Sequence, residues 1–486
     1  MPRNRLFVLF WLIFAAASAA DLAWDGSGAR AQSASAQGQS LLLVGATLID
    51  GTGAPPVENA WVRVDDGRIT AVGRGDAPPS RGARILDLRG MTVLPGLSDM
   101  HVHVQNKARG AWALKMLVAH GVTNVRDVGS PLDELRAVQD WMRTDPAVPH
   151  LTTSGVILNG NGPQGLFLMP GPKLTAQMEA DLAAGARFVK SHNEVSLAGA
   201  RAIAAFAKEH DTPWIGHVPF TMTSLTAIDV GLTSVEHMQV RASEVVGDPE
   251  VVARYPIGTS SRLRDNYWAA LDPGSPVLQA TLAGWEKRRN RFFFDPTLVA
   301  QYNLAHGDVD PFLSQEEWDL ATPLLQQQWS ERGRTMPGSV NVAGWAETKV
   351  AFRKQLEFLR LAHARGVRLL TGTDFGAYRE VPGVALLKEL ELLAESGLSP
   401  AEVIRASTSR AAEILRTPDR GTIAPGQVAD LVVVRGNAAA DIRAMRQTEH
   451  VVIGGRLFGA SELMAEARRL RSADAAPSGA AVRRLH

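Results

Sequence analysis

The chain contains no cysteine among its 486 residues. This absence excludes a disulfide scaffold, a thiolate zinc site, an iron–sulfur cluster and a cysteine nucleophile. It also excludes a lipid anchor attached to an N-terminal cysteine. Whatever chemistry the chain performs has to come from its other side chains.

The chain also lacks an excess of charge of either sign. Its 51 Lys and Arg residues are balanced by 50 Asp and Glu residues, which gives a net charge of +1. Proteins that bind nucleic acid through its phosphates usually carry a basic excess, so we expect no nucleic-acid partner. With 45% hydrophobic and 21% charged residues, the composition is that of a folded soluble protein.

The apolar run at the N-terminus is short. Two arginines precede a stretch of about 15 residues that begins at Leu6 and ends in small residues, whereas a helix needs about 20 residues to span a bilayer. The pattern is typical of a secretory signal peptide. We expect a signal peptide over 1–20 and a polar linker over 21–40, with a membrane anchor as the alternative. The mature protein is then exported, periplasmic or extracellular, and free of the membrane.

The remaining chain shows two kinds of pattern. Short strand-like segments separated by Gly, Pro and Asp turns occupy residues 41–95 and again 421–460. Between them, residues 96–420 alternate apolar strand-like runs with Ala- and Leu-rich helical stretches. This alternation predicts a parallel sheet of the α/β class, most economically a (β/α)8 TIM barrel. The terminal strands can pair as one small β-domain, and a helix and tail follow over 461–486.

The segment from about 242 to 348 does not follow this alternation. It contains five tryptophans in helical pieces separated by polar loops. We interpret it as one or more insertions on the barrel, which include a lid in one reading. Ordinary helices on the outside of the barrel are the alternative.

The pentapeptide Met100-His101-Val102-His103-Val104 is the most informative motif. Alternate residues of a strand point to the same side, so His101 and His103 can present both imidazoles to one metal ion. Asp99 is placed to support such a ligand from behind.

Four further residues stand at the ends of successive predicted strands. They are Lys190, His217, His237 and Asp374. The C-terminal ends of barrel strands converge on the face where active sites form. Three of these residue types suit a divalent metal, but a cationic lysine is ordinarily a poor ligand.

Taken together, the motifs resemble those of the amidohydrolase superfamily, and more closely those of its imidazolonepropionase-like and prolidase-like metal-dependent hydrolases. The resemblance covers about residues 41–458. Its motifs are Val93–His103, Gly121–Asp127, Gly216-His217, Glu236-His237, Gly372–Asp374, Ala406–Thr408 and Gly421–Leu431. The resemblance implies a distorted (β/α)8 barrel with a composite β-sandwich domain formed from both ends of the chain.

The resemblance also implies a ligand set for two divalent metal ions. By position, His101, His103 and Asp374 bind one ion, His217 and His237 bind the second, and a carboxylated Lys190 bridges them. Carboxylation turns the amine into an anionic carbamate, which removes the objection to lysine as a ligand. Histidine and carboxylate ligands favour zinc but leave manganese, cobalt and iron open. A mononuclear site, with Lys190 paired to an acid, is the alternative.

The expected activity is hydrolysis of a C–N amide bond in a dipeptide of the Xaa-Pro kind or an N-acyl amino acid. A metal-activated hydroxide attacks the carbonyl, and Asp374 passes the proton to the leaving amine. The same site acting on a lactone, ester, carbamate or phosphotriester is an alternative, and deamination is disfavoured because a bridging lysine indicates two metals. A non-catalytic binding protein on a hydrolase barrel is the alternative from another class.

Two residues are candidates for substrate binding. His192 follows Lys190 by two positions, and Asn161 lies in the glycine-rich loop 159–165. A histidine exposed in a loop is the plain alternative for His192. The expected partner is a small-molecule substrate, and a homo-oligomer is left open.

Overall fold

The computed structural model describes residues 40–104, 107–160, 168–255, 266–307, 313–335, 344–376 and 379–471. The predicted signal peptide, nearly all of the linker, Asn161 and the tail beyond residue 471 lie outside these ranges. Among the described helices, none combines the length and the apolar character that crossing a bilayer requires. The predicted domain boundaries stay predictions.

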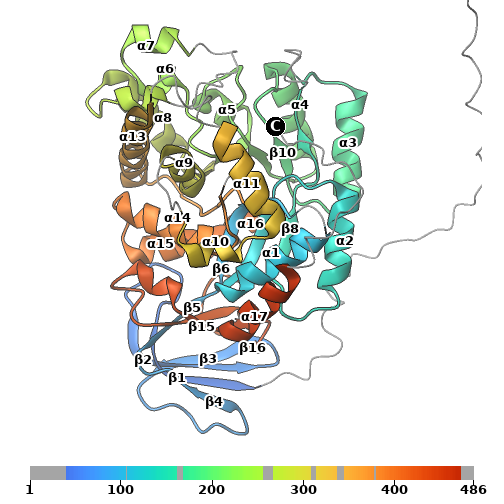
Figure 1. The fold of residues 1–486 in the computed structure, drawn as a ribbon, viewed down its shortest axis with the longest axis vertical. Coiled ribbons are helices and arrows are strands. Elements are labelled where there is room, and N and C mark those ends of the chain that lie inside the picture. Colours follow the sequence, from blue (N-terminus) through green and yellow to red (C-terminus); the bar gives the residue numbers. More distant parts are fainter. Residues whose placement is uncertain are drawn as a thin grey trace, which may run out of the picture. The chain divides into compact units, whose positions relative to one another are not determined.

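Strands from both ends of the chain form one eight-stranded sheet, in which Figure 1 shows the blue N-terminal strands beside the red C-terminal ones. The order is β16-β15-β14-β5-β1-β2-β3, and β4 pairs with β1. The strands are β1 (Leu41–Leu48), β2 (Val57–Asp65), β3 (Arg68–Arg74), β4 (Arg84–Asp87), β5 (Met91–Pro95), β14 (Leu431–Arg435), β15 (Thr448–Ile453) and β16 (Arg456–Gly459). The β-domain predicted to combine both ends of the chain is therefore present.

Local sequence explains how this sheet begins. β2 and β3 are joined by Asp66 and Gly67, whose φ angles of 50° and 80° are those of a type I′ hairpin turn. On one side, β1 pairs with β4 over Leu41–Val44 and with β5 over Thr47–Leu48. The change of partner on this side of β1 comes directly after Val44, at Gly45. The C-terminal part joins where β14 runs antiparallel to β5.

The central part of the chain contains two parallel sheets. One has three strands in the order β6-β7-β8, and the other has five in the order β13-β12-β11-β10-β9. Their bounds are β6 (Leu97–Val102), β7 (Val122–Asp127), β8 (His150–Thr153), β9 (Ile157–Leu158), β10 (Val189–Ser191), β11 (Trp214–Gly216), β12 (Leu232–Glu236) and β13 (Phe293–Asp295). The predicted α/β class with parallel strands is confirmed.

Backbone hydrogen bonds connect residues 367–376 to both sheets. Leu370 N donates to Phe294 O of β13 at 2.9 Å, and Met100 N of β6 donates to Thr371 O at 2.8 Å. This segment therefore lies between β13 and β6, and it brings the loop with Asp374 beside the two histidines of β6.

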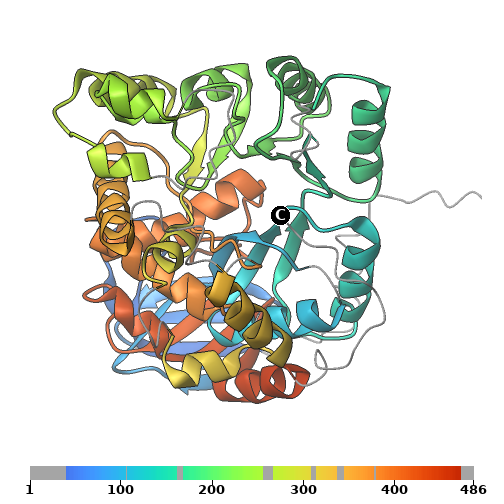
Figure 2. The same ribbon diagram turned by 45° about the horizontal axis from the view of Figure 1, so that its top comes forward.

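Helices follow most of the parallel strands and lie around them (Figure 2). They are α1 (Lys107–Ala119), α2 (Leu132–Met142), α3 (Pro172–Ala183), α4 (Leu197–Glu209), α5 (Ser224–Val230), α6 (Ala242–Val245), α7 (Pro249–Ala253), η3 (Asn266–Ala270), α8 (Pro276–Arg288), α9 (Leu298–Ala305), α10 (Gln315–Leu320), α11 (Pro323–Thr335), α13 (Gly344–Ala364), α14 (Val384–Glu395), α15 (Pro400–Ser407), α16 (Ser409–Leu415), η4 (Ile442–Arg446) and α17 (Ala460–Arg471). Many begin at a Ser or Thr cap, as α4 does at Ser196.

The segment 242–348 differs from the prediction in one respect. It is not an uninterrupted insertion, because β13 lies inside it and pairs with β12 in the five-stranded sheet. The strand has only three residues, so no apolar alternation marks it in the sequence. Trp268 and Trp285 are fully buried among neighbouring aromatic rings, as packing residues are.

Asp430, in the loop before β14, joins the composite sheet to the parallel strands. Its carboxylate lies 3.0 Å from His150 Nε2 and 3.4 Å from Arg420 Nε, and accepts a hydrogen bond from Gly454 N at 2.8 Å. Burial raises the pKa of Asp430, but these partners outweigh it and leave the pKa below its ordinary value.

We expect Asp430→Asn to destabilise the fold by about 2 kcal/mol at pH 7, because a buried charge-assisted network loses its anion. A lowered carboxyl pKa stabilises the fold above the unfolded-state value of about 3.9, and this contribution is lost as the pH falls through the folded-state pKa. Urea unfolding should therefore separate the two proteins at pH 7, and the difference should shrink as the pH falls below the unfolded-state value toward the lowered folded-state pKa. The surface variant Asp229→Asn is the control and should change little. A pH-independent difference at Asp430 would contradict this account.

Candidate metal centre

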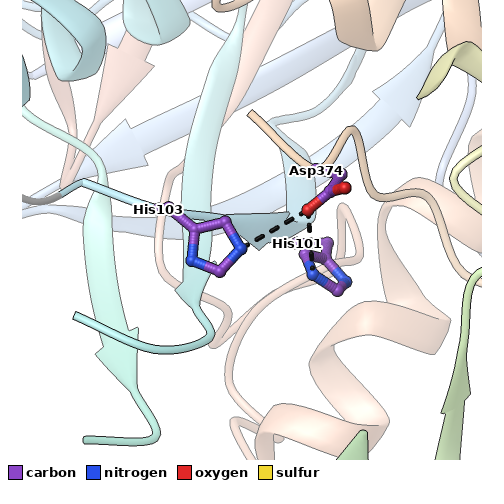
Figure 3. A group of neighbouring side chains, drawn as sticks. All are labelled: His101, His103 and Asp374. Atoms are coloured by element: carbon purple, nitrogen blue, oxygen red, sulfur yellow. Dashed lines mark ion pairs between the residues drawn. The ribbon is translucent and has the colours of Figure 1, made fainter. Parts of the chain in front are cut away.

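His101, His103 and Asp374 converge on one point (Figure 3). His101 lies on β6 and His103 directly follows it. Asp374 Oδ1 is 3.3 Å from His101 Nε2 and 3.4 Å from His103 Nε2. These residues offer three ligand atoms within 4.8 Å of one another, which is the spacing that one metal ion requires.

The loop holds Asp374 in a left-handed conformation, with a φ of 65°. Asp374 N donates to His101 O at 2.8 Å. Asp99 accepts hydrogen bonds from Thr373 Oγ1 at 2.8 Å and from Thr373 N at 3.1 Å. Asp99 thus supports the ligand set through the residue before Asp374, as well as through His101 N at 3.3 Å.

His217 and His237 form a second pair, each directly after a strand of the five-stranded sheet. Their Nε2 atoms are 2.9 Å apart. His217 Nδ1 lies 3.1 Å from Asn193 Oδ1, and His237 Nδ1 lies 2.7 Å from Thr297 Oγ1. Burial lowers the pKa of both imidazoles, which favours the neutral form that binds metal.

Lys190 lies on β10 between the two groups of histidines. Its side chain is buried, and Nζ is 3.5 Å from His101 Nε2. Among the described residues, no carboxylate oxygen lies within 4.0 Å of Nζ. These residues therefore provide no acid partner for Lys190, which the mononuclear alternative would need. Burial lowers the pKa of the amine from 10.5 to about 8, with Glu236 opposing this shift and Arg126 adding to it.

The two predicted substrate-binding residues have different outcomes. The ring of His192 packs against that of His217, with centroids 3.9 Å apart. Its Nδ1 atom is buried and has no hydrogen-bond partner among the described residues. His192 therefore borders the ligand set, whereas Asn161 lies outside the described residues.

Sequence reasoning assigned no role to a buried charged group beneath His101. Glu236 Oε2 is 2.7 Å from His101 Nδ1, and Arg126 contacts both Glu236 and Asp295. All three are fully buried. The available signal was a charged residue directly after a valine of a predicted strand, since Arg126 follows Val125 on β7 and Glu236 follows Val235 on β12. Such residues are rarely buried without a partner.

The donor set fits a divalent cation. Four imidazoles and one carboxylate meet at the C-terminal ends of parallel strands. His101, His217 and His237 are buried, and the side chain of His103 is 18% exposed. The two facing Nε2 atoms would each be satisfied by a shared cation, because both Nδ1 atoms already have partners. Ligands of this kind suit zinc and related metals.

Comparison with known proteins gives a consistent picture. Residues 337–458 match the family model described as the Amidohydrolase family. An allantoinase of Streptomyces avermitilis is 39% identical over 100 residues, which make up 20% of this chain and 21% of that enzyme. The chain matches about a fifth or less of the length of its curated relatives.

Solved structures match over a much larger part of the chain. An Xaa-Pro dipeptidase with bound methionine matches with a TM-score of 0.64 and 20% identity, over 86% of this chain and 100% of that one. A bottromycin amidohydrolase matches with a TM-score of 0.67 and 23% identity, over 91% and 93% of the two chains. At sequence identities this low, the structural similarity establishes a shared fold and nothing further.

Proposed function

We propose that this chain belongs to the amidohydrolase superfamily and is a metal-dependent hydrolase that cleaves carbon–nitrogen amide bonds. The observation that carries the proposal is the convergence of His101, His103 and Asp374, with the facing pair of His217 and His237 and with Lys190 beside them. A non-catalytic binding protein on a hydrolase fold would not require these histidine, aspartate and lysine side chains to converge.

We further propose that two divalent ions, most economically zinc, occupy the site with Lys190 as their bridge. The free amine adds to carbon dioxide, which forms a carbamate N–C bond and releases one proton. A pKa of about 8 supports this step, because a large fraction of the amine is then neutral near physiological pH. An ordinary lysine amine is almost fully protonated there.

The bound metal would lower the pKa of a water molecule to about 7 and polarise the scissile carbonyl. Asp374 supplies the proton transfer. Although burial raises the pKa of its carboxyl, His237, His103 and Lys190 bring it below the ordinary value, so the group is ionised and accepts a proton. It then delivers that proton to the leaving nitrogen, which amide cleavage requires because an amide anion is a poor leaving group.

The substrate class is proposed as a dipeptide of the Xaa-Pro kind or an N-acyl amino acid. The fold shared with a structure described as an Xaa-Pro dipeptidase supports this choice. We also propose that the parallel strands β6–β13, together with residues 367–376, form a distorted (β/α)8 barrel, which the bonds from residues 367–376 to β6 and β13 support. Export to the periplasm or beyond is proposed from the N-terminal pattern.

The test is a paired substrate panel on protein purified without chelators. Each N-acyl amino acid or dipeptide is matched with the ester or lactone that carries the same acyl group. We expect hydrolysis of amides that disappears on chelation and returns with added zinc. Turnover of the esters alone would overturn the assignment of amide substrates. A protein that holds no metal and hydrolyses nothing would overturn the assignment as a hydrolase.

A further inference from the structure

We propose that Glu236 and Arg126 are positioning residues that hold His101 in the tautomer able to bind a metal ion. The inference rests on the proposed function in so far as His101 is a metal ligand. Neither residue faces the point where His101, His103 and Asp374 converge. Glu236 contacts the Nδ1 atom of His101, and Arg126 contacts the peptide oxygen of the preceding residue.

The contact between Glu236 and His101 is short and buried. Glu236 Oε2 lies 2.7 Å from His101 Nδ1, and the two side chains are 0% and 1% exposed. No solvent can replace either partner at such burial. The orientation of the imidazole ring therefore depends on this carboxylate.

Besides its contact with His101, Glu236 accepts hydrogen bonds from two side chains. Arg126 Nη2 donates to Oε1 at 2.8 Å and to Oε2 at 2.9 Å, and Ser234 Oγ donates to Oε1 at 2.5 Å. A guanidinium has no acceptor and keeps its charge, so the group beside it is a carboxylate with only lone pairs to offer. The proton between Glu236 and His101 must therefore sit on His101 Nδ1.

This assignment decides what the other ring nitrogen can do. With the proton on Nδ1, His101 Nε2 carries a lone pair, and it points toward Asp374 Oδ1 at 3.3 Å and Lys190 Nζ at 3.5 Å. The opposite tautomer would place a hydrogen there and block metal binding.

Arg126 also fixes the backbone of the same strand. Its Nε atom donates to Met100 O at 2.6 Å, directly before His101. One guanidinium thus holds the main chain at His101 and, through Glu236, the side chain. It lies on β7, next to β6 in the three-stranded sheet, so the strand pairing itself sets this distance.

The other histidines have weaker partners at Nδ1. His217 Nδ1 lies 3.1 Å from the amide oxygen of Asn193 and 3.0 Å from the amide nitrogen of Gln239, so its partners do not favour one tautomer. His237 faces the hydroxyl of Thr297, which can either donate or accept. His103 Nδ1 has no hydrogen-bond partner among the described residues. Hydrogen bonds to an ionised group are about twice as strong as neutral ones, so His101 is the ligand whose tautomer is most firmly set.

The first experiment measures zinc affinity by competition with a chromophoric chelator in wild type, Glu236→Gln, Asp295→Asn and Glu244→Gln. The glutamine can donate to Nδ1 as well as accept from it, so we expect zinc binding to weaken about 10- to 100-fold. Asp295 contacts Arg126 at 3.3 Å and belongs to the same buried group, so a loss in Asp295→Asn would show that the whole group holds His101. The matched control is Glu244→Gln, which changes an equally buried glutamate that bonds Ser224, and it should change the affinity by less than about threefold. Equal affinity for wild type and Glu236→Gln, or an equal loss in Glu236→Gln and Glu244→Gln, would overturn the proposal.

The second experiment reads the tautomer directly in metal-free protein. Nitrogen-15 NMR of labelled histidine, assigned with His101→Gln, should show the Nδ1–H form of His101 in wild type and a mixture in Glu236→Gln. An Nε2–H form in wild type would overturn the proposal even if zinc affinity fell. Arg126→Lys provides a second variant that keeps the charge but loses the bond to Met100 O, and it should shift the same resonance if Glu236→Gln does not fold. A wild type that binds no zinc would defeat the proposed function, while the NMR result would still decide the tautomer.

Discussion

Replacing Lys190 by alanine is expected to reduce the metal content from two ions per chain to one or none, and kcat/KM for amides by about 10³-fold, or roughly 4 kcal/mol. The reason is that the buried amine lies 3.5 Å from His101 Nε2, on the strand that pairs with the one His217 follows, and no carboxylate among the described residues forms an ion pair with it. Metal content by elemental analysis and steady-state kinetics on the same preparation test the prediction.

Two controls separate a carbamate from a simple cation at this position. Lys190→Arg keeps the positive charge but cannot form the carbamate, so it should behave like the alanine variant. Added acetate or propionate should restore part of the activity of Lys190→Ala, since a short carboxylate can occupy the space of the missing bridge. Full metal content in Lys190→Ala would reduce Lys190 to a packing role.

The same lysine gives the site a pH dependence. Its amine has a pKa lowered to about 8, and only the neutral amine adds to carbon dioxide. Reloading of chelated wild-type protein with zinc at a fixed concentration of dissolved carbon dioxide, held constant at every pH, should therefore accelerate as the pH rises toward 8 and then level off. A rate that does not change between pH 6.5 and 8.5 would argue against the carbamate.

Asp374→Asn is expected to lower kcat by about 10²- to 10⁴-fold while most of the metal is retained. The amide oxygen of asparagine can still act as a ligand beside His101 and His103, but it cannot take a proton from water or return one to the leaving amine. The measurement is kcat on an amide substrate, with metal content determined in parallel.

The leaving group provides the internal control for Asp374. Activated esters need no proton on their leaving group, so their hydrolysis should suffer much less from Asp374→Asn than amide hydrolysis does. An equal loss for both substrates would assign Asp374 to metal binding alone. Complete loss of metal would lead to the same conclusion.

Local patterns in the chain were enough to predict the α/β class, the β-domain shared by both ends and the set of metal-binding candidates. Period-two alternation placed His101 and His103 on one side of a strand, and the order of β and α segments placed Lys190, His217, His237 and Asp374 at strand ends. These features depend on short-range sequence, because alternation and strand endings are local properties.

Only the tertiary structure decided the rest. β13 has three residues and escaped notice because its pairing with β12, rather than its own alternation, makes it a strand. Arg126 reaches the backbone before His101 because β7 pairs with β6, whereas Glu236 lies on β12 of the other parallel sheet. Only the packing of the two sheets brings its carboxylate to within 2.7 Å of His101 Nδ1. The sequence by itself determined which residues are candidates for metal binding. In our proposal, the packing of the parallel strands decides which ring nitrogen His101 presents, because a tautomer is set by a partner that only the fold supplies.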